Sequence, residues 1–295
     1  MTGTKPIQYD LHAHSTASDG SLSPTGLVEA AAGAGVGVLA LTDHDGTDGL
    51  DEAAAAARRV GIGFVPGVEI SVSWRKGTVH ILGLGIDPDC PELRAGLARL
   101  QSWREWRAEE IARRLERAGI PDALAGARRF ARGRIVGRTH FARHLVAAGY
   151  CKDMKTVFKR YLVKNRPGHV PGQWARLEEA VGWIRAAGGQ AVIAHPARYR
   201  YTATRLRALI GEFRECGGEG LEVVSGSHTR QEISHMARVA VHHGLLASAG
   251  SDYHGPESPY LQLGCLPPLP GDCTPIWSAG KIALYGRENE RAIAP

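Results

Sequence analysis

The sequence predicts an α/β fold in which parallel strands and helices close into a barrel that is interrupted by an α-helical insertion. Seven short apolar runs recur along the 295 residues, and helical patterns lie between several of them. This rhythm stops between Pro91 and about Gly188, where the pattern becomes helical throughout. The predicted units are therefore a first barrel part (1–90), an α-helical insertion that acts as a substrate lid (91–188) and a second barrel part (189–295).

Each of the seven predicted strands is a short apolar run that polar or glycine-rich residues end. Strands that alternate with helices favour a parallel sheet, and seven of them over this length favour a closed barrel over an open sheet. No glycine-rich motif of the dinucleotide-binding or P-loop type follows any strand, so neither function has support. The strands are Gln8–Ala13, Val36–Leu41, Gly63–Val65, Val79–Gly83, Ala191–Ala194, Gly220–Val224 and Leu245–Ala249.

Three of the helices between these strands combine a polar start with a glycine stop, as helix ends commonly do. The start and stop pairs are Ser23-Pro24 with Gly33 or Gly35, Thr47-Asp48 with Gly61, and the capping box of Thr229 and Glu232 with Gly244.

The insertion is strongly basic. From Pro91 to Ala175 there are 19 Lys and Arg against 7 Asp and Glu, whereas the rest of the chain has 17 against 23. A basic middle within an acidic frame indicates two structural units and a polyanionic ligand for the insertion. Helices are predicted at 91–119, 137–149 and 153–163, and a further helix at 177–187 could belong either to the insertion or to the barrel rim.

Composition excludes several classes of protein. Apolar residues at 43% and charged residues at 22% are ordinary globular values and argue against disorder. The five cysteines are scattered and form no C-x-x-C pair, so neither a disulfide framework nor a thiolate zinc site is expected. No apolar stretch resembles a secretion signal or a membrane span, so we expect a cytoplasmic protein without a membrane partner.

Nine side chains that can bind metal lie on or just beyond the apolar runs. In a parallel barrel the carboxyl ends of the strands open on one face, so these side chains should converge there. A satisfied polar residue at a strand end would explain any one of them, but nine buried together without ions would carry a severe cost of unpaired charge. The predicted ligands are His12, His14, Asp19, His44, Glu69, His80, His195, Asp252 and His254.

The chemistry of this ligand set points to phosphate. Imidazole and carboxylate ligands without thiolate suit Mn, Fe or Zn. Three divalent ions would bring six positive charges against three negative charges from Asp19, Glu69 and Asp252, so the centre calls for an anionic substrate. A metal cluster can activate water and bind both the attacking and the leaving oxygens of a phosphate ester.

The motifs DLHAHSTASDG, LALTDHD, PGVEIS, AVIAHP and GSDYHG, together with the strand that carries His80, resemble those of the polymerase and histidinol phosphatase (PHP) family. The resemblance extends over nearly the whole chain. The segments GRTHFARHL and RPGHVPGQW resemble one branch, the nucleoside 3′,5′-bisphosphate phosphatases, which include the 5′→3′ exoribonuclease called ribonuclease AM. Two residues depart from that branch: Gly46 stands where Thr would be expected, and His169 where Tyr would be expected.

The resemblance implies a distorted (β/α)7 barrel and a centre of three divalent metal ions, with manganese expected and iron or zinc as alternatives. It implies no separate protein nucleophile, because a hydroxide held by the metal ligands attacks phosphorus. The implied substrates are nucleoside bisphosphates or short 5′-phosphorylated RNA, with no DNA-specific partner. By motif, the ligand sets are His12, His14, Glu69 and Asp252 for one ion, Asp19, His44 and His254 for a second, and Glu69, His80 and His195 for a third.

Residues near these motifs are candidates for substrate binding. The predicted contacts are Arg138, His140 and Arg143 in the insertion and Arg198 just past the AVIAHP motif, because arginine suits bidentate phosphate binding. Solvated helix faces are the alternative for the arginines, and a structural role is the alternative for His140.

Other candidates have weaker support. Asp10 is a candidate acceptor that orients an imidazole, or an ordinary residue at a strand start. Aromatic side chains of the insertion could stack on bases or form its core; these are Trp103, Trp106, Phe141 and Trp174.

Three other functions compete with this interpretation. A histidinol-phosphate phosphatase would need to bind a positively charged amine, which a basic insertion repels. An amidohydrolase acting on C–N bonds often carries a bridging lysine at a strand end, and Glu69 occupies that place here. A non-catalytic RNA-binding module would use metals only structurally, but structural sites are usually closed and have few ligands.

Overall fold

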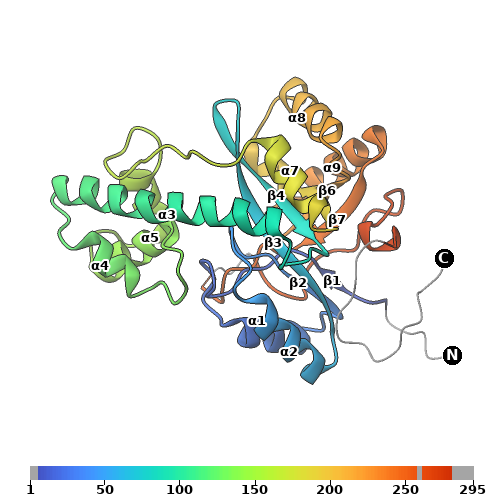
Figure 1. Cartoon of the computed structure of the whole chain (residues 1–295), viewed down its shortest axis with the longest axis horizontal. Coiled ribbons are helices and arrows are strands. Elements are labelled where there is room, and N and C mark those ends of the chain that lie inside the picture. Colours follow the sequence, from blue (N-terminus) through green and yellow to red (C-terminus); the bar gives the residue numbers. More distant parts are fainter. Residues whose placement is uncertain (1–5, 258–260, 281–295) are drawn as a thin grey trace.

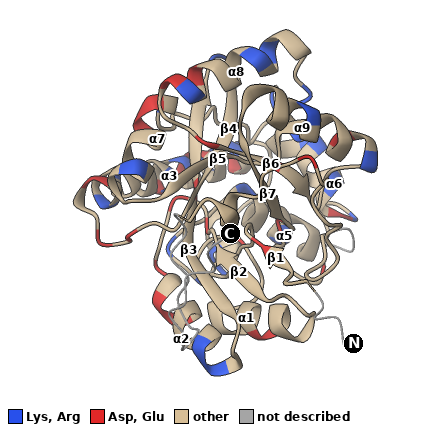
Figure 2. Cartoon of the chain, turned by 90° about the vertical axis from the view of Figure 1, so that its right-hand side faces the viewer, with Lys and Arg blue, Asp and Glu red and all other residues tan. Residues whose placement is uncertain are grey.

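The computed structural model describes residues 6–257 and 261–280, and its seven strands form one sheet that curls into a nearly closed barrel (Figures 1 and 2). The barrel closes between its first and last strands. The N–H of Leu11 donates to the carbonyl of Ala249 at 2.8 Å, and Ala13 forms a parallel bridge with Tyr253. The predicted α/β barrel is confirmed. Its strands, in spatial as in chain order, are β1 (Tyr9–Asp10), β2 (Val38–Leu41), β3 (Gly63–Trp74), β4 (Gly77–Leu84), β5 (Gln190–Ile193), β6 (Gly220–Ser225) and β7 (Leu246–Gly250).

The prediction that all strands are parallel is wrong at β4, which is antiparallel to both β3 and β5. Only Arg75 and Lys76 connect β3 to β4. A connection of two residues permits an antiparallel hairpin, whereas parallel neighbours need a crossover of a dozen or more residues. β3 also continues well past Val65, the predicted end, as far as Trp74. Both strands of this hairpin carry functional side chains, so the departure from the repeating pattern lies at the site itself.

The helix ends agree with two of the three predictions. α1 (Pro24–Gly33) begins after Ser23, which caps it, and α9 (Arg230–His243) has the predicted capping box and ends at Gly244. α2 (Leu50–Val60) ends as predicted at Gly61, which has a left-handed backbone with φ of 78°. It begins later than predicted, because residues 47–50 form a turn before the helix.

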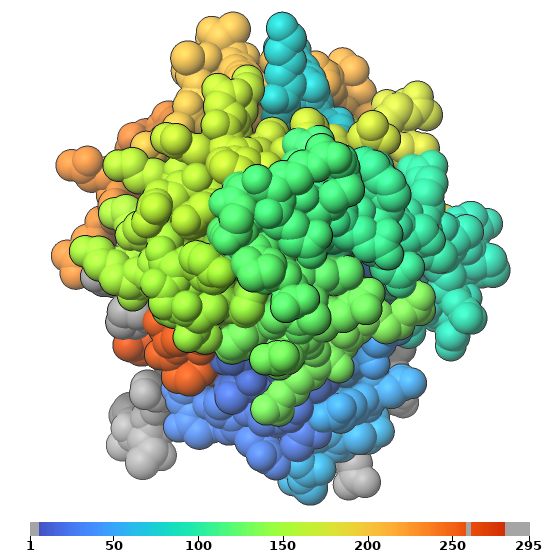
Figure 3. Space-filling model, turned by 90° about the vertical axis from the view of Figure 1, so that its left-hand side faces the viewer, coloured from blue at the N-terminus to red at the C-terminus, as the bar shows by residue number. Residues whose placement is uncertain are grey.

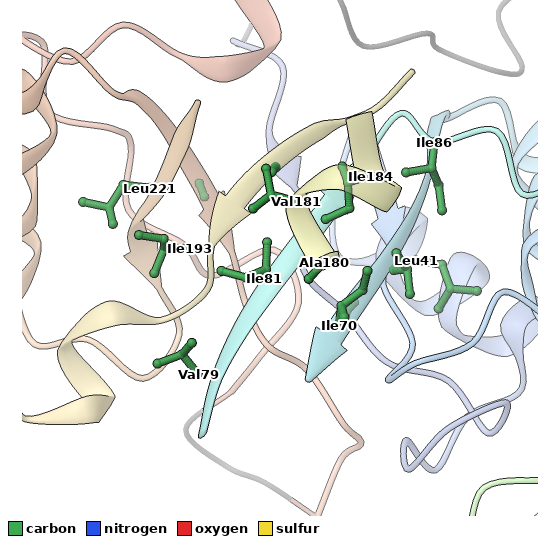
Figure 4. Close-up of a cluster of buried hydrophobic side chains, with 14 of the residues drawn as sticks. Leu41, Ile70, Val79, Ile81, Ile86, Ala180, Val181, Ile184, Ile193 and Leu221 are labelled. Atoms are coloured by element: carbon green, nitrogen blue, oxygen red, sulfur yellow. The ribbon is translucent and has the colours of Figure 1, made fainter. Parts of the chain in front are cut away.

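Helices cover the outside of the barrel, and one of them resolves an alternative left open by the sequence. α7 (Leu177–Ala186) packs on the sheet and not in the core of the insertion. Its side chains Ala180, Val181 and Ile184 meet Ile70 and Ile81 of the hairpin (Figure 4). α8 (Ala203–Glu215) follows β5 and contributes its apolar face to the same outer layer.

The amino-terminal end of the barrel is closed by residues near the carboxyl end of the described chain. Pro275 forms a parallel bridge with Ala247 of β7. Ile276, in the single-turn helix η3 (Ile276–Ser278), is fully buried among the residues that point into the barrel, and Trp277 stacks on Tyr9 with ring centroids 4.2 Å apart. The barrel is therefore open only at the face where the carboxyl ends of its parallel strands meet.

The insertion lies between β4 and β5 and projects from the barrel along α3 (Pro91–Arg117) (Figures 1 and 3). The first half of α3 packs on the barrel through Leu93 and Leu97, whereas Ile111 and Leu115 belong to a separate apolar core of the insertion. The unit boundaries at 91 and 188 stay a prediction. None of the described helices is long and apolar enough to cross a membrane. The other helices are α4 (Ala123–Arg128), α5 (Arg138–Ala147), α6 (Met154–Val157) and the π-helical turn η1 (Phe158–Leu162).

A buried ion pair joins the insertion to the barrel. The guanidinium of Arg104 on α3 lies 2.6 Å from the carboxylate of Asp45, which follows β2, and also donates to the hydroxyl of Ser71 on β3. A second contact lies at Gly133, where an added Cβ would come within 2.6 Å of the carbonyl oxygen of Ala17. The insertion is therefore packed tightly against the loops of the barrel face.

Replacing Arg104→Ala should lower the free energy of unfolding by about 3 to 5 kcal/mol, because it leaves the Asp45 carboxylate buried without its partner. Urea denaturation of the metal-free protein measures this change. The control is Arg113→Ala, which breaks an exposed pair with Glu110 on the same helix and should change stability by less than about 1 kcal/mol. Equal effects of the two substitutions would contradict a structural role of the buried pair.

Candidate active site

The carboxylate of Glu69 is buried at the centre of five imidazole rings. Glu69 lies in the middle of β3, where its backbone bridges to His44 at the end of β2. This strand pairing, rather than the predicted position after the third strand, brings Glu69 to the site. Its oxygens lie 2.8 Å from Nδ1 of His80, 2.9 Å from Nδ1 of His44, 3.1 Å from Nε2 of His195, 3.3 Å from Nε2 of His14 and 3.5 Å from Nε2 of His12.

Two further carboxylates complete the cluster. Asp252, just past β7, lies 3.3 Å from Nε2 of His14 and 3.6 Å from Nδ1 of His254. Asp19 lies 3.2 Å from Nε2 of His254 and accepts a hydrogen bond of 2.9 Å from the hydroxyl of Thr139 on α5. All nine predicted ligands therefore converge, and one of them is held by a residue of the insertion.

Several residues around the site have a backbone that side chains with a Cβ rarely adopt. Asp45, His195 and Asp252 have φ of 49°, 29° and 56°. Strained backbone of this kind persists only where surrounding contacts hold it, and it gathers at functional sites. The N–H of Asp252 donates to the carbonyl of His12 at 2.8 Å, and the N–H of His195 donates to the carboxylate of Glu222 at 2.5 Å.

The cluster is strongly coupled electrostatically. Burial alone would lower the pKa of His12 and His14, but neighbouring carboxylates outweigh it, so that the pKa of His12 lies well above its usual value and that of His14 is raised to about 10. For His44 and His195, burial prevails and the pKa is lowered. Burial would raise the pKa of Glu69, but the surrounding imidazoles hold it well below its usual range. Neighbouring imidazoles likewise hold the pKa of Asp19 and of Asp252 well below its usual range against the effect of burial, so all three carboxylates favour the ionised form.

This arrangement fits divalent metal ions. Nε2 of His12 lies 3.1 Å from Nε2 of His14, so two imidazole nitrogens face one another. Buried polar atoms without a hydrogen-bond partner include Nδ1 of His14, Nδ1 of His195 and one oxygen each of Asp19 and Glu69. The donor atoms form four groups, and within each group all atoms lie within 4.8 Å of one another. The groups are His14, Asp19, His44 and His254; His12, Glu69 and His195; His12, His14 and Asp252; and His44, Glu69 and His80.

The donor groups differ in part from the ligand sets that the family resemblance implies. Asp19, His44 and His254 gather as expected, with His14 beside them. His80 and His195 fall into separate groups that share Glu69, whereas the resemblance places both on one ion. The assignment of donors to individual ions stays a prediction.

The sequence did not single out Glu222, which supports two ligands at once. One oxygen of Glu222 lies 3.0 Å from Nδ1 of His12, and the other accepts the N–H of His195. A carboxylate in the otherwise apolar strand GLEVVS is the signal that could have indicated it. Of the two interpretations of Asp10, the structure favours an ordinary residue at a strand start, because its carboxylate accepts the backbone N–H of Ser251 at 2.8 Å.

Seven of the nine clustered side chains, all except His12 and His14, form the floor of a cavity of about 430 Å³ between the barrel and the insertion. Four arginines from both units line it, and the insertion adds His169 and Trp174. Arg104 and Arg107 were not predicted. They are three apart on α3 and stack on Trp174 with 4.9 and 5.2 Å between guanidinium and ring centroid. The four arginines are Arg104, Arg107, Arg138 and Arg198.

Only two of the four predicted substrate contacts lie at the cavity, namely Arg138 and Arg198. Arg198 also pairs with Asp252 at 2.5 Å. His140 is buried and its Nδ1 accepts the N–H of Gly137, which caps the start of α5. Arg143 turns away and pairs with Glu257 at 2.6 Å.

Only one of the four aromatic residues that were candidates for base stacking lies at the cavity. Trp174 lines the cavity, whereas Phe141 is part of the insertion core. Trp103 and Trp106 stack on one another with centroids 4.5 Å apart.

Comparison with known sequences relates the chain to phosphoesterases. Residues 10–87 match the PHP domain model. The chain is 52% identical over 269 residues to a 3′,5′-nucleoside bisphosphate phosphatase of Chromobacterium violaceum, with 91% of this chain and 94% of that protein covered. It is 44% identical over 273 residues to the 5′-3′ exoribonuclease Rnm of Escherichia coli, with 92% and 93% covered.

Two solved structures share the fold of this chain. A structure from Chromobacterium violaceum, described as an amidohydrolase with bound sulfate and no metal, superimposes with a TM-score of 0.92 at 49% identity, covering 97% of this chain and all of that one. A protein of Bifidobacterium adolescentis, for which metal-dependent phosphoesterase activity has been suggested, gives a TM-score of 0.78 at 28% identity over 95% of this chain and 96% of that one.

Replacing Glu222→Gln should weaken Mn²⁺ binding by about 10- to 100-fold, since the groups that orient metal-binding imidazoles have effects of this size. Calorimetric titration of the metal-free protein measures the affinity, and circular dichroism checks that the fold is kept. Glu29→Gln, an exposed carboxylate on α1 paired with Arg59, is the matched control. Unchanged affinity in the Glu222 variant would show that it does not hold the ligands in place.

Proposed function

The chain belongs to the PHP-domain family of phosphoesterases, and we propose that it removes the 3′-phosphate from nucleoside 3′,5′-bisphosphates and degrades short 5′-phosphorylated RNA in the 5′→3′ direction. The observation that carries this proposal is the pairing of a nine-ligand cluster with a wall of four arginines in one cavity. The cluster suits the phosphate that reacts, and the arginines suit a second phosphate on the same nucleotide.

Both activities require the cleavage of only one kind of bond. In each, a water oxygen bonds to phosphorus, the P–O3′ bond breaks and O3′ leaves with a proton. A bisphosphate then gives a nucleoside 5′-monophosphate and inorganic phosphate. RNA gives a nucleoside 5′-monophosphate and a strand that is one nucleotide shorter and again carries a 5′-phosphate. A single site can therefore support the activities named for both groups of relatives.

We infer that the nine side chains bind three divalent metal ions. Manganese is the expected metal, and iron or zinc are alternatives. Divalent ions bound there would polarise the phosphoryl oxygens and lower the pKa of water. The chain itself orients these ligands through Glu222 and Thr139. The insertion also covers the open face of the barrel and so narrows access to the cluster (Figure 3).

Arg107 is the best candidate for contact with the second phosphate. Its guanidinium is buried, and among the described residues it bonds only to the carbonyl oxygen of Val170, with no carboxylate as a partner. Burial, and then the positive charges of Arg138 and Arg104, lower its pKa to about 9. A buried cation without a counter-ion is unfavourable, so this position favours an anionic ligand.

The same contacts weigh against the other candidate functions. Histidinol phosphate carries a positive amine, which the arginine wall repels. The structural relative described as an amidohydrolase binds sulfate, a tetrahedral oxyanion like phosphate, and here Glu69 lies where a bridging lysine would be expected in enzymes that act on C–N bonds. A purely structural metal site would not need an adjoining cavity lined by arginines.

The deciding experiment compares three substrates with Mn²⁺ present: adenosine 3′,5′-bisphosphate, histidinol phosphate and a 5′-phosphorylated oligoribonucleotide. We expect turnover of the bisphosphate and the RNA, measured as released phosphate and as released adenosine monophosphate. Turnover of histidinol phosphate alone would overturn the proposed role of the insertion, and RNA binding without turnover would favour a non-catalytic module.

Replacing Glu69→Gln or His195→Ala should abolish phosphate release, because each removes a donor from the centre of the cluster. The folded state is checked by circular dichroism, and bound metal by elemental analysis. Retained turnover in either variant would sink the assignment of the cluster as the active centre.

Replacing Arg107→Met should lower kcat/KM for adenosine 3′,5′-bisphosphate by about 10- to 100-fold, the range expected for a lost hydrogen bond to a charged group. The kcat/KM for adenosine 3′-monophosphate, which lacks the 5′-phosphate, should be almost the same in the variant as in the wild type. The methionine keeps an apolar stem beside Trp174. Equal losses on both substrates would show that Arg107 does not bind the second phosphate.

A further inference from the structure

A strip of aromatic and basic side chains leads out of the cavity at the side of the cluster formed by His80 and His195. It begins at Tyr199, which lines the cavity. The ring of Tyr199 lies edge-on to the ring of His195 with centroids 5.5 Å apart, and its hydroxyl accepts the N–H of His80 at 2.8 Å. The inner end of the strip is therefore fixed against two proposed metal ligands.

The strip continues outward over the β3–β4 hairpin. The ring of Tyr201 lies 5.4 Å from that of Tyr199 and 5.6 Å from that of Trp74. The guanidinium of Arg205 lies 4.1 Å from the centroid of Tyr201. A Cβ at Gly77, in the hairpin, would be 3.2 Å from the Tyr201 hydroxyl, so ring and hairpin are in contact.

None of the cations of this strip forms an ion pair among the described residues, and the one carboxylate that Arg200 influences electrostatically is that of Glu232. Nε of Arg205 is buried and has no hydrogen-bond partner. Lys76 at the hairpin turn and Arg200 between the two tyrosines are exposed, and neither forms an ion pair within the described part of the chain. The neighbouring Arg75 and Arg198, in contrast, are paired with carboxylates. Cations beside a row of aromatic rings, here tilted by 30° and 44° to one another, are typical of a surface that binds single-stranded nucleic acid.

The chemistry of the proposed reaction requires such a surface on this side. The cavity, at about 430 Å³, is the size of a site for one small ligand. In RNA the phosphate at the cluster is also esterified to the next nucleotide, so the rest of the strand leaves from the cluster. It cannot leave past Arg107 and Trp174, where the 5′ nucleotide would lie. The strip starts at the cluster on the barrel side, next to His80 and His195.

We propose that Tyr199, Tyr201, Arg205, Lys76 and Arg200 form a track that binds the RNA strand downstream of the scissile phosphate. This inference rests on the proposed exoribonuclease activity and adds a binding site outside the cavity. Bases would stack along the exposed parts of the tyrosine rings, and the cations would bind the phosphates between them. Neither contact reads a base edge, so the track accepts single-stranded RNA of any sequence.

The test compares substrates of increasing length in the full-length protein with Mn²⁺. The variant is Lys76→Glu combined with Arg200→Glu, which reverses two exposed charges without disturbing the core. Arg58→Glu, which reverses one exposed charge on α2 at the opposite end of the molecule from the hairpin, is the control for charge reversal away from the track (Figure 1). Tyr201→Ala tests the stacking contact separately. The substrates are adenosine 3′,5′-bisphosphate and 5′-phosphorylated RNA of two to six nucleotides.

For both track variants we expect kcat/KM on the bisphosphate to stay within about twofold and kcat/KM on the hexamer to fall by about tenfold, with the loss growing with strand length. In the charge variant, kcat/KM on the hexamer should also fall less steeply with salt concentration than in the wild type, because the variant makes fewer phosphate contacts. The Arg58 control should match the wild type on every substrate.

Four outcomes overturn the track. Equal losses on the bisphosphate and the hexamer would indicate damage to the active site, and no loss on the hexamer would show that the strand runs elsewhere. If the wild type hydrolyses the bisphosphate but no RNA, the track fails while the phosphatase activity stands. If it hydrolyses neither, the proposed function fails and the track falls with it.

Discussion

The structure depends on one buried carboxylate, that of Glu69, which must remain ionised within reach of five imidazoles. An isolated buried charge would be too unfavourable to keep, so each neighbouring ring must be brought to it with some precision. The barrel does this by contributing rings from both its first and its later strands. Closure between β1 and β7 is thus a condition for the site as much as for the fold, because it brings His12 beside Asp252.

The insertion takes part in this balance of charge as well as covering the barrel. Through Arg104 it neutralises Asp45, whose neighbour His44 contacts Glu69, and through Thr139 it holds Asp19. Arg107 and Arg138 form no ion pair among the described residues and face the cavity, where an anionic substrate would balance their charge. The charge division visible in the sequence, with a basic middle in an acidic frame, thereby acquires a structural meaning: each unit supplies the charge that the other lacks.

The motifs at the strand ends were enough to predict the barrel and all nine members of the cluster, because residues at the ends of neighbouring strands must meet. The antiparallel β4 was missed, since Pro66 and Gly67 interrupt the apolar pattern and hide the continuation of β3. Contacts that join distant parts of the chain were also missed. Glu222 supports His12 across 210 positions of sequence, and nothing local to either residue indicates that they are partners.

The sequence could not show which arginines of the insertion line the cavity and which form ion pairs, because this depends on how the helices are oriented. Arg143 and Arg138 lie on the same short helix, yet one pairs with Glu257 and the other lines the cavity. The same uncertainty applied to His140, whose imidazole turned out to cap its own helix.

The closure of the barrel by Ile276 and Trp277 has a consequence for the order of events in turnover. Because the far end is blocked, substrate and both products enter and leave at the face of the barrel beneath the insertion, where the proposed track also begins. In the proposed reaction the released phosphate lies on the cluster at the floor of the cavity, and the nucleoside monophosphate lies above it beside the arginines of the insertion. With a polymer the deeper phosphate is the end of the remaining strand, which can stay bound while the vacated space above it receives the next nucleotide. The closed end of the barrel would thus favour several cleavages each time that the protein binds an RNA strand.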